Sequence, residues 1–238
     1  MDLLSHDPVM APVVRLVEKA AKCFANVLIV GESGVGKTYI ARRIHEASPV
    51  ACEGFHILLC YPGMDAGRAG ADLVEALTYF ESQGGTIVVK DVHNLNRPQQ
   101  QRLLAYLDRR ERRLPSRGGR RTRLVFTSLC DLEMRLGLDF LRPLHMRIAV
   151  ITIKVPPLRE RRRDIINLAR SFLRQYSMEE KRHVWGFSRD AEEMLLKLPW
   201  HGNIHELRST INRAVVMAED GEVVDACALM GVLHGIVS

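Results

Sequence analysis

The stretch that decides the fold is Gly31 to Thr38, GESGVGKT, which stands between the apolar run 27–30 and the helix-like sequence TYIARRIHEA. Glycines at this spacing let backbone N–H groups fold around a polyphosphate, and the N-terminus of the following helix adds the positive end of its dipole. Strand, glycine-rich loop and helix come in the order that a phosphate-binding P-loop requires. The predicted phosphate site consists of Gly31, Glu32, Ser33, Gly34, Val35, Gly36, Lys37 and Thr38.

Lys37 and Thr38, at the end of this loop, are the side chains expected to meet the phosphates and a metal. A lysine at this position reaches the β and γ phosphates in P-loop proteins. The Thr38 hydroxyl is the expected ligand for Mg²⁺, if the metal is bound. The loop therefore predicts a site for a charged ligand, and the rest of the chain decides what happens to that ligand.

The composition is that of a globular chain with a surplus of positive charge. Of 238 residues 47% are hydrophobic, and 34 Lys and Arg against 28 Asp and Glu give a net charge of +6. No run is long enough to span a bilayer, and the first residues do not indicate a signal or transit peptide. Five scattered cysteines are expected to be reduced, so we expect a cytoplasmic protein without a membrane partner. Residues 109–123 hold eight arginines against one glutamate, which favours either a solvated face or a surface that attracts a polyanion.

Strand and helix patterns alternate over the first two thirds of the chain. Helical spacing occurs at residues 8–23, 38–45, 71–82 and 98–110. Strand-like apolar runs occur at 27–30, 55–61, 86–89, 122–128 and 148–155. This alternation predicts an α/β fold with a parallel, doubly wound sheet, and it places Lys90 and Asp91 at the carboxyl edge where ligands bind.

Pro156 and Pro157 mark a change of pattern. Beyond them helical spacing dominates, and Ser188 and Asn203 stand where helix N-caps are expected. Trp185 is expected to pack inside this helical region. We therefore predict two domains, a P-loop α/β domain over residues 1–157 and a helical lid over residues 158–238.

Four blocks of sequence, in a fixed order, carry a family resemblance. They are GESGVGKTYIARRIHEAS at 31–48, GGTIVVKDVHNL at 84–95, VPPLRERRRDI at 155–165 and PWHGNIHELRSTINRAV at 199–215. Together they resemble the AAA+ central domain of bacterial enhancer-binding transcription regulators, the NtrC-like family, over nearly the whole chain. The resemblance implies an AAA+ sheet flanked by helices, a small all-helical lid, and ATP or ADP as the ligand.

The resemblance also implies partners. It indicates self-association into a ring or a dimer, RNA polymerase as a candidate partner, and DNA contacted through a flanking domain that is not part of this chain. We expect either an excised central domain or a reduced natural protein.

Two departures from the family pattern bear on the partner and on the metal. Members that act on sigma-54 carry a GAFTGA loop before the Walker B strand, whereas residues 63–70 read GMDAGRAG, so we expect no contact with sigma-54. The Walker B Asp and Glu are replaced by Lys90 and Asp91. In such ATPases one carboxylate helps to hold Mg²⁺ and the other orients the attacking water, and an ammonium group cannot ligate a cation.

Other catalytic positions of the family are changed as well. Leu129 stands at the sensor I asparagine, and Leu59 stands at the asparagine that switches the Walker B glutamate. Of the two arginine-finger positions, one matches Leu141 and the other matches Arg147, which remains a candidate finger. His205 replaces the sensor II arginine, so its contact with a γ-phosphate would be weaker and dependent on pH.

These losses lead to a hypothesis with two alternatives. Removal of one group that stabilises the transferring phosphoryl typically costs on the order of 10²- to 10³-fold in rate, and several are absent here. We expect that nucleotide binding is retained and that hydrolysis is weak or absent. The alternatives are an active ATPase in which Asp91 takes both carboxylate roles, and a scaffold that oligomerises without nucleotide.

Three groups of basic residues allow two readings each. Lys90 either neutralises the phosphates without a metal or pairs with Asp91. Arg42 and Arg43 follow the P-loop where some divergent family members bind cyclic di-GMP, and they either contact that ligand or lie on an exposed helix face or a subunit contact. The segment 109–123 maps onto the hairpin that lines the ring pore, where DNA is a candidate ligand.

Overall fold

The structure, a computed structural model, describes residues 7–61, 73–112, 121–219 and 221–234. It divides into two compact units. The sheet unit comprises Pro12–Gly31 and Lys37–Val155, and the lid unit comprises Met1–Ala11, Glu32–Gly36 and Pro156–Ser238. The change of unit at Pro156 lies beside the domain boundary expected from sequence. Assignment of the P-loop residues 32–36 to the lid unit was not expected.

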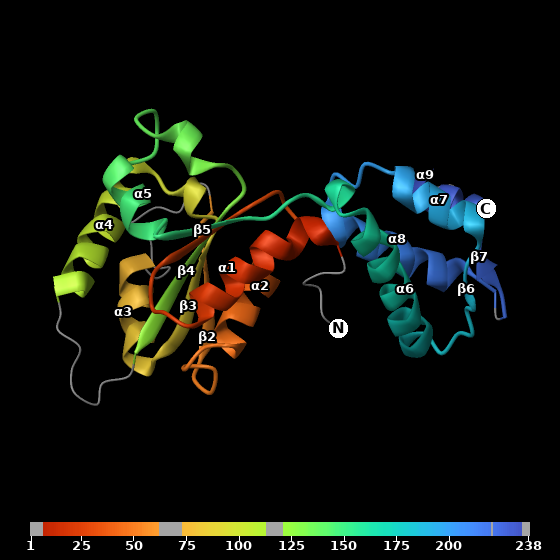
Figure 1. Cartoon of the computed structure of the whole chain (residues 1–238), viewed down its shortest axis with the longest axis horizontal. Helices are drawn as coiled ribbons and strands as arrows, with labels where there is room; N and C mark the ends of the chain where they lie inside the picture. Colours follow the sequence, from red (N-terminus) through yellow and green to blue (C-terminus); the bar gives the residue numbers. More distant parts are fainter. Residues whose placement is uncertain (1–6, 62–72, 113–120, 220, 235–238) are drawn as a thin grey trace. The chain divides into compact units, whose positions relative to one another are not determined.

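Five parallel strands form the sheet of the sheet unit (Figure 1). They are β1 (Val27–Val30), β2 (Phe55–Leu59), β3 (Gly85–Lys90), β4 (Thr122–Ser128) and β5 (Ile151–Lys154). Their order is β2-β3-β4-β1-β5, with β1 paired to β4 and to β5 in parallel register. The predicted parallel α/β sheet is therefore confirmed. The glycine-rich loop follows β1, which lies between β4 and β5.

Helices cover both faces of this sheet. They are α1 (Ala11–Ala21), which follows the 3₁₀ turn η1 (Pro8–Met10), α2 (Lys37–Glu46), α3 (Leu73–Gln83), α4 (Arg97–Arg112) and α5 (Arg142–Ile148), with 3₁₀ turns η2 (Val92–Asn94) and η3 (Leu132–Arg135). In Figure 1, α1 and α2 lie on one face and α3, α4 and α5 on the other. Alternate strand residues point to opposite faces, so Leu28, Ile87 and Phe126 pack toward α3 to α5 in one buried cluster.

One predicted strand is shorter than expected. Residues 148–155 were expected to be extended, yet α5 occupies Arg142–Ile148 and β5 begins only at Ile151. Pro143 stands in the first turn of α5, where its fixed φ favours a helix start. The β-branched residues of this stretch are therefore shared between a helix end and a strand.

The lid unit is mainly helical. Its elements are the 3₁₀ turn η4 (Leu158–Glu160), α6 (Arg162–Glu179), β6 (Gly186–Phe187), α7 (Arg189–Lys197), α8 (Asn203–Met217), β7 (Val223–Val224) and α9 (Ala226–His234). The predicted helical lid is confirmed, with one addition, because β6 and β7 form a two-residue parallel pair. Ser188 caps α7 as predicted, since its hydroxyl accepts the backbone N–H of Ala191.

The two tryptophans have opposite environments. Trp200 is fully buried in the lid core, and its indole Nε1 donates to the backbone oxygen of Leu195 at 2.8 Å. Trp185 is 77% exposed. The packing role predicted for Trp185 is therefore wrong, because the lid core is filled by the tryptophan of the Pro-Trp-His-Gly segment instead.

The arginine-rich segment is not one uniform loop. Arg109, Arg110 and Arg112 end α4, while Arg123 lies in β4 and is fully buried; residues 113–120 lie outside the described residues. The Arg123 guanidinium donates to the backbone oxygens of Ala20 at 2.5 Å, of Ala21 at 2.9 Å, and of Cys23. Arg123 thus satisfies the carbonyl groups at the C-terminus of α1, and it is not available to a polyanion.

Two further expectations concern the environment of the chain. None of the helices in the described ranges combines the length and apolar character needed to cross a bilayer. All five cysteines are free thiols.

Replacement of Arg123 tests its structural role. We expect Arg123→Leu to lower the free energy of unfolding by about 2–4 kcal/mol, because three carbonyl groups at the end of α1 lose their donor in a buried site. Urea unfolding of the purified chain measures this. The control is Arg121→Leu, which removes an exposed guanidinium stacked on Phe24 and should cost less than about 1 kcal/mol. Equal losses for the two variants would contradict the assignment.

Candidate functional site

The backbone of the P-loop depends on two glycines with positive φ. Gly34 has φ +75° and Gly36 has φ +100°, a region that side chains disfavour. A Cβ at Gly34 would lie 2.1 Å from the backbone oxygen of Gly202, so the site tolerates no side chain there. Gly34 oxygen also accepts the N–H of Ile204 at 3.1 Å. The loop has the close-packed glycine backbone that a phosphate cradle requires.

Three side chains of the lid unit hold the P-loop residues 32–36. Arg159 makes a bidentate ion pair with Glu32, at 2.9 and 2.7 Å. Buried Asn203 donates to a Glu32 carboxylate oxygen at 3.1 Å and to the Ser33 backbone oxygen at 2.8 Å. Buried Arg161 donates to the Val35 oxygen at 3.2 Å. These contacts, which we call the loop clamp, fix the P-loop within the lid unit.

The electrostatics of the clamp favour the charged form of Glu32. The Arg159 hydrogen bond, assisted by Asn203, lowers the pKa of Glu32 from 4.5 to about 2. Glu32 therefore stabilises the folded state above pH 4.5, and this contribution is lost as the pH falls from about 4.5 to 2. At neutral pH the clamp carries a full ion pair.

Asn203 was predicted to cap a helix, and that prediction is wrong. The residue before it, Gly202, is the N-cap of α8, and Asn203 begins the helix with φ +55°. Its side chain bonds residues far away in the sequence instead. The Oδ1 accepts the backbone N–H of Leu158 at 2.7 Å, and the amide nitrogen donates to the backbone oxygen of Ser33 in the P-loop. Asparagine tolerates the left-handed conformation better than other residues with a side chain.

His205 lies beside the P-loop, as expected for a candidate nucleotide contact. A Cβ at Gly34 would lie 3.2 Å from the Cβ of His205. The lid unit thus brings His205 next to the same loop that Asn203 and Arg159 hold. Its contact with a nucleotide remains a prediction.

In the sheet unit, Lys37 opens α2 and is buried. Its Nζ donates to the backbone oxygen of Gly31 at 2.7 Å. Burial lowers the pKa of Lys37 to about 8, with the Asp91 carboxylate acting to raise it and Lys90 to lower it. Thr38 follows in the first turn of the same helix. The predicted phosphate-binding lysine is therefore placed at a helix N-terminus, near one carboxylate and one ammonium group.

Lys90 and Asp91 stand at the carboxyl end of β3, as the sequence predicted. Lys90 is the last residue of the strand, and Asp91 follows with φ +61°, which is rare for a residue with a side chain. The Asp91 N–H donates to the Thr127 hydroxyl at 3.0 Å. Its Oδ1 is buried and has no hydrogen-bond partner in the described part of the chain. This unpartnered oxygen lies at the edge of the sheet where ligands bind in such folds.

Two apolar side chains occupy positions where the family resemblance places asparagines. Leu59, paired in register with Lys90, is 50% exposed, and Leu129, directly after β4, is 42% exposed. Neither side chain can orient water or a phosphate oxygen by hydrogen bonding. That these two positions have lost a catalytic function stays a prediction.

His93 was missed by the sequence reasoning. It lies two residues after Asp91, and its Nδ1 accepts the backbone N–H of Leu129 at 3.4 Å. Burial lowers the pKa of His93, so the neutral ring serves as this acceptor. A histidine three residues beyond the end of a strand carries no motif that would have identified this contact.

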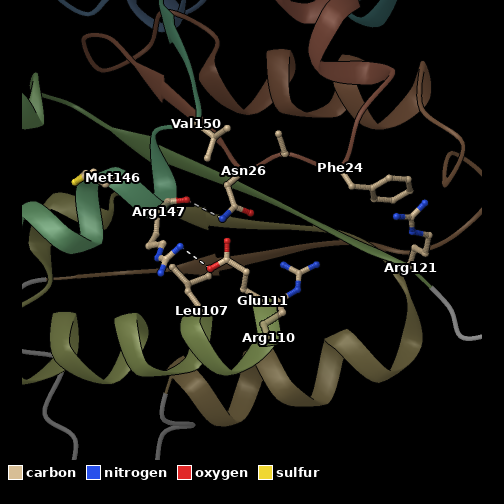
Figure 2. A pocket seen from close by; sticks show the side chains of 10 residues that line it. Phe24, Asn26, Leu107, Arg110, Glu111, Arg121, Met146, Arg147 and Val150 are labelled. Atoms are coloured by element: carbon tan, nitrogen blue, oxygen red, sulfur yellow. Dashed lines mark hydrogen bonds and ion pairs between the residues drawn. The ribbon is translucent and has the colours of Figure 1, made fainter. Parts of the chain in front are cut away.

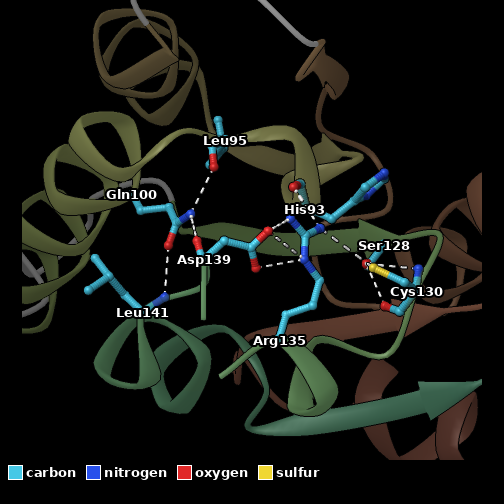
Figure 3. A network of polar contacts seen from close by, with 8 residues as sticks. All are labelled: His93, Leu95, Gln100, Ser128, Cys130, Arg135, Asp139 and Leu141. Atoms are coloured by element: carbon cyan, nitrogen blue, oxygen red, sulfur yellow. Dashed lines mark hydrogen bonds and ion pairs between the residues drawn. The ribbon is translucent and has the colours of Figure 1, made fainter. Parts of the chain in front are cut away.

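A polar network fixes the chain beyond His93 (Figure 3). Arg135 pairs with Asp139 and donates to the His93 backbone oxygen at 3.0 Å. Buried Gln100 donates to the Asp139 backbone oxygen at 2.8 Å and accepts the Leu141 N–H at 2.8 Å. The network joins η2, α4 and the start of α5, so it positions Leu141 through its backbone.

Arg147, the candidate arginine finger, is ion-paired within the chain. It contacts Asp108 at 3.1 Å and Glu111 at 2.5 Å, both on α4. Its backbone oxygen accepts the Asn26 amide at 2.8 Å, beside a cavity of about 420 Å³ (Figure 2). Any action of Arg147 on a neighbouring subunit requires release from these carboxylates, and the finger role stays a prediction.

The second-messenger candidates Arg42 and Arg43 both have partners. The Arg42 guanidinium lies 4.4 Å from the centroid of the Phe55 ring. Arg43 pairs with Glu46 at 3.2 Å on the surface of α2. Arg42 remains exposed, so its second face is open to a planar ligand.

Substitutions at Asn203 test the loop clamp. Asn203→Gly keeps the left-handed backbone and removes every side-chain bond, so we expect it to lower the free energy of unfolding by about 1–3 kcal/mol. Asn203→Asp keeps the acceptor for Leu158 and removes the donors to the P-loop. Hydrogen exchange should show the Leu158 amide protected in Asn203→Asp and exposed in Asn203→Gly. Wild-type stability in both variants would show that the clamp contributes no free energy.

Comparisons with known proteins agree with this geometry. The family model described as "Sigma-54 interaction domain" matches residues 4–158, and the model described as "AAA+ ATPase lid domain" matches residues 159–235. The transcriptional regulatory protein ZraR of Klebsiella oxytoca is 33% identical over 90% of this chain and 52% of its own length. The alginate biosynthesis regulator AlgB of Pseudomonas aeruginosa is 33% identical over 94% of this chain and 53% of its own length.

Solved structures share the fold. NtrX from Brucella abortus in complex with ATP has a TM-score of 0.81 at 24% identity, covering 99% of this chain and 58% of that one. The ADP complex of NtrX has a TM-score of 0.75 over 95% of this chain and 55% of that one. The chain spans about half the length of the curated relatives it matches. On the family match, which covers more than half of its residues, the chain belongs to the sigma-54 interaction domain family of AAA+ proteins, with an AAA+ lid.

Proposed function

We propose that this chain is the cytoplasmic, nucleotide-binding and self-associating module of a bacterial transcription regulator, and that it hydrolyses ATP weakly or not at all. The observation that carries the proposal is the position of Lys90 at the carboxyl end of β3. There it replaces the carboxylate that would help to hold Mg²⁺, while the P-loop keeps its glycine backbone and Lys37.

The charges around the phosphates support binding without a full metal site. Lys37 and Lys90 supply two ammonium groups, whereas Asp91 supplies one carboxylate. Two cations near the phosphates neutralise part of their charge, which a metal would otherwise do. Thr38 is the side chain that would offer a hydroxyl to Mg²⁺ when the metal accompanies the nucleotide.

A second candidate function is an active ATPase with rearranged groups. The observation in its favour is the buried Oδ1 of Asp91, which has no partner among the described residues. A free carboxylate oxygen at this edge could orient water or hold a cation. This candidate and the proposed function differ in turnover, and each predicts nucleotide binding.

The partners of the module are also proposals. The matched family is described as a sigma-54 interaction domain, so the match gives no support to action without sigma-54. We keep that independence as a proposal because GMDAGRAG replaces GAFTGA at residues 63–70, which lie outside the described residues. Co-sedimentation with sigma-54 RNA polymerase in the presence of ATP tests it, and nucleotide-dependent association would refute it.

Calorimetry and turnover together test the nucleotide site. We expect ATP to bind wild type about equally well with Mg²⁺ and with EDTA, and not to bind Lys37→Ala. Lys90→Asp should weaken binding in EDTA by about tenfold or more, because it reverses a charge beside the phosphates. Cyclic di-GMP is titrated in parallel on wild type and on Arg42→Ala.

The outcomes of that experiment separate the readings. Mg²⁺-dependent multiple turnover that disappears in Lys37→Ala would favour the active ATPase. Failure of ATP, ADP and cyclic di-GMP to bind would favour an oligomerisation scaffold. Tight binding of cyclic di-GMP that is lost in Arg42→Ala would make the second messenger the ligand.

The pKa of Lys37 gives a pH prediction. In the free protein this pKa is about 8, and phosphate oxygens placed against the ammonium group would raise it. Above pH 8 binding must therefore take up a proton, and the affinity for ATP should fall as the pH rises, by up to about tenfold per unit. Calorimetry from pH 6.5 to 9.5 measures the slope. Lys37→Arg is the control, since its guanidinium stays charged and should give a flat profile.

A further inference from the structure

The lid unit carries a surface hollow that the nucleotide site does not use. It has a volume of about 480 Å³ and lies at the C-terminal end of α6 and along the segment that leads to β6. Its lining includes Arg174, Met178, Lys181, Arg182, Val184 and Trp185. We call it the Trp185 surface.

Two large apolar side chains are presented here to solvent. Trp185 is 77% exposed and Met178 is 79% exposed. The backbone of Trp185 is fixed, because its N–H donates to the Glu222 backbone oxygen at 3.0 Å, next to the β6–β7 pair. Exposed tryptophan and methionine on a fixed backbone are typical of protein-binding surfaces, where they anchor a partner.

The end of α6 places a lysine where glycine is preferred. Lys181 has φ +54°, and the N–H groups of Lys181 and Arg182 donate back to the oxygens of Met178 and Ser177, at 3.3 and 2.9 Å. This is a Schellman motif, whose left-handed position usually holds glycine and disfavours a side chain by roughly 1 kcal/mol. The motif turns the chain sharply and carries the Lys181 ammonium at the edge of the hollow.

The arginines and the lysine that line the hollow give it a positive charge. None of its lining residues, all of which belong to the described part of the chain, is acidic. Arg182 donates to the Ala218 backbone oxygen at 2.6 Å. Within the described residues, Arg174 and Lys181 form no ion pair. Exposed apolar side chains next to two cations without an ion pair among the described residues fit a partner that carries carboxylates around an apolar side chain.

A second copy of the chain fits this surface poorly. Among the exposed apolar residues of the sheet unit, Met134 and Leu138 are each 80% exposed and have acids close by in the sequence. Two of these acids, Asp131 and Asp139, already pair with Lys154 and Arg135 inside the chain. Those carboxylates would have to give up their partners to meet another lid.

A nucleic acid also fits poorly. Its affinity for proteins comes mainly from many phosphate contacts with lysine and arginine. Here two lining cations form no ion pair within the described residues, and the lining also includes an indole, a thioether and a valine. The chemistry favours an amphipathic peptide over a polyanion.

We propose that the Trp185 surface docks an acidic segment of a partner protein, with one aliphatic or aromatic side chain seated against Trp185 and Met178 and with carboxylates facing Arg174 and Lys181. The segment supplies apolar contact area at the centre and charge pairing at the rim. This docking does not depend on whether the chain hydrolyses ATP.

Peptide display followed by titration tests the proposal. A phage library of random 12-residue peptides is selected on the full chain, and the enriched peptides are synthesised and titrated. We expect two or more Asp or Glu around an apolar residue, and a blue shift of tryptophan emission as Trp185 is covered while Trp200 stays buried. Trp185→Ala and Lys181→Glu should each weaken binding by about tenfold or more.

Matched variants make the result decisive. Arg189→Glu changes the charge at another exposed position of the lid unit and should leave binding unchanged. Circular dichroism confirms that each variant is folded, and Trp185→Phe should keep most of the affinity. Selection of peptides without acids, binding indifferent to Lys181→Glu, preferential binding of a 12-nucleotide single strand, or loss of self-association in Trp185→Ala would each overturn the proposal.

Discussion

The hold of the lid unit on P-loop residues 32–36 is the constraint on which the rest of the site depends. Two glycines with positive φ let this segment fold back on itself, and the space at Gly34 is closed by the backbone of Gly202. Arg159 and Asn203 then anchor Glu32 through charged and amide hydrogen bonds. Lys37, the candidate phosphate-binding lysine and the first residue of α2, follows this segment directly in the sequence.

At the carboxyl edge of the sheet, the charge of the side chains determines which ligands can bind. A carboxylate and an ammonium group at the end of β3 have opposite effects on a phosphate and on a cation. With Lys90 at the strand end and Lys37 buried close to Asp91, the described groups favour an anion more than a metal. Leu59 and Leu129 add apolar surface where hydrogen-bonding groups would be needed to place a water molecule. Under the proposed function, binding and hydrolysis draw on different residues.

Much of the fold and of the candidate site could be predicted from sequence. The residues that were misread all depend on partners that are distant in the sequence. The presence of the P-loop, of the strands and of the cap by Ser188 is signalled by neighbours within a few positions, so local patterns were sufficient. Asn203, Arg123 and Trp185 were misread because their roles depend on partners far away in the chain. Asn203 looks like a cap by its position, yet it bonds Ser33 and Leu158. Arg123 lies in an arginine-rich segment of the sequence, yet its guanidinium donates to backbone carbonyl groups at the C-terminus of α1. Neither the spacing of residues nor the composition of a segment indicates which distant residues it will contact.

The proposed loss of hydrolysis changes how the module would respond to its partners. An ATPase that turns over is driven through its conformational states by hydrolysis. In a protein that only binds nucleotide, the populations of those states are set by the free ligand concentrations. Under that regime linkage is reciprocal, so a partner docked on the lid unit would alter nucleotide affinity by the factor by which nucleotide alters the docking. The lid unit holds both the loop clamp and the Trp185 surface. A ligand at either place acts on the same folded unit, and coupling between them needs no chemical step.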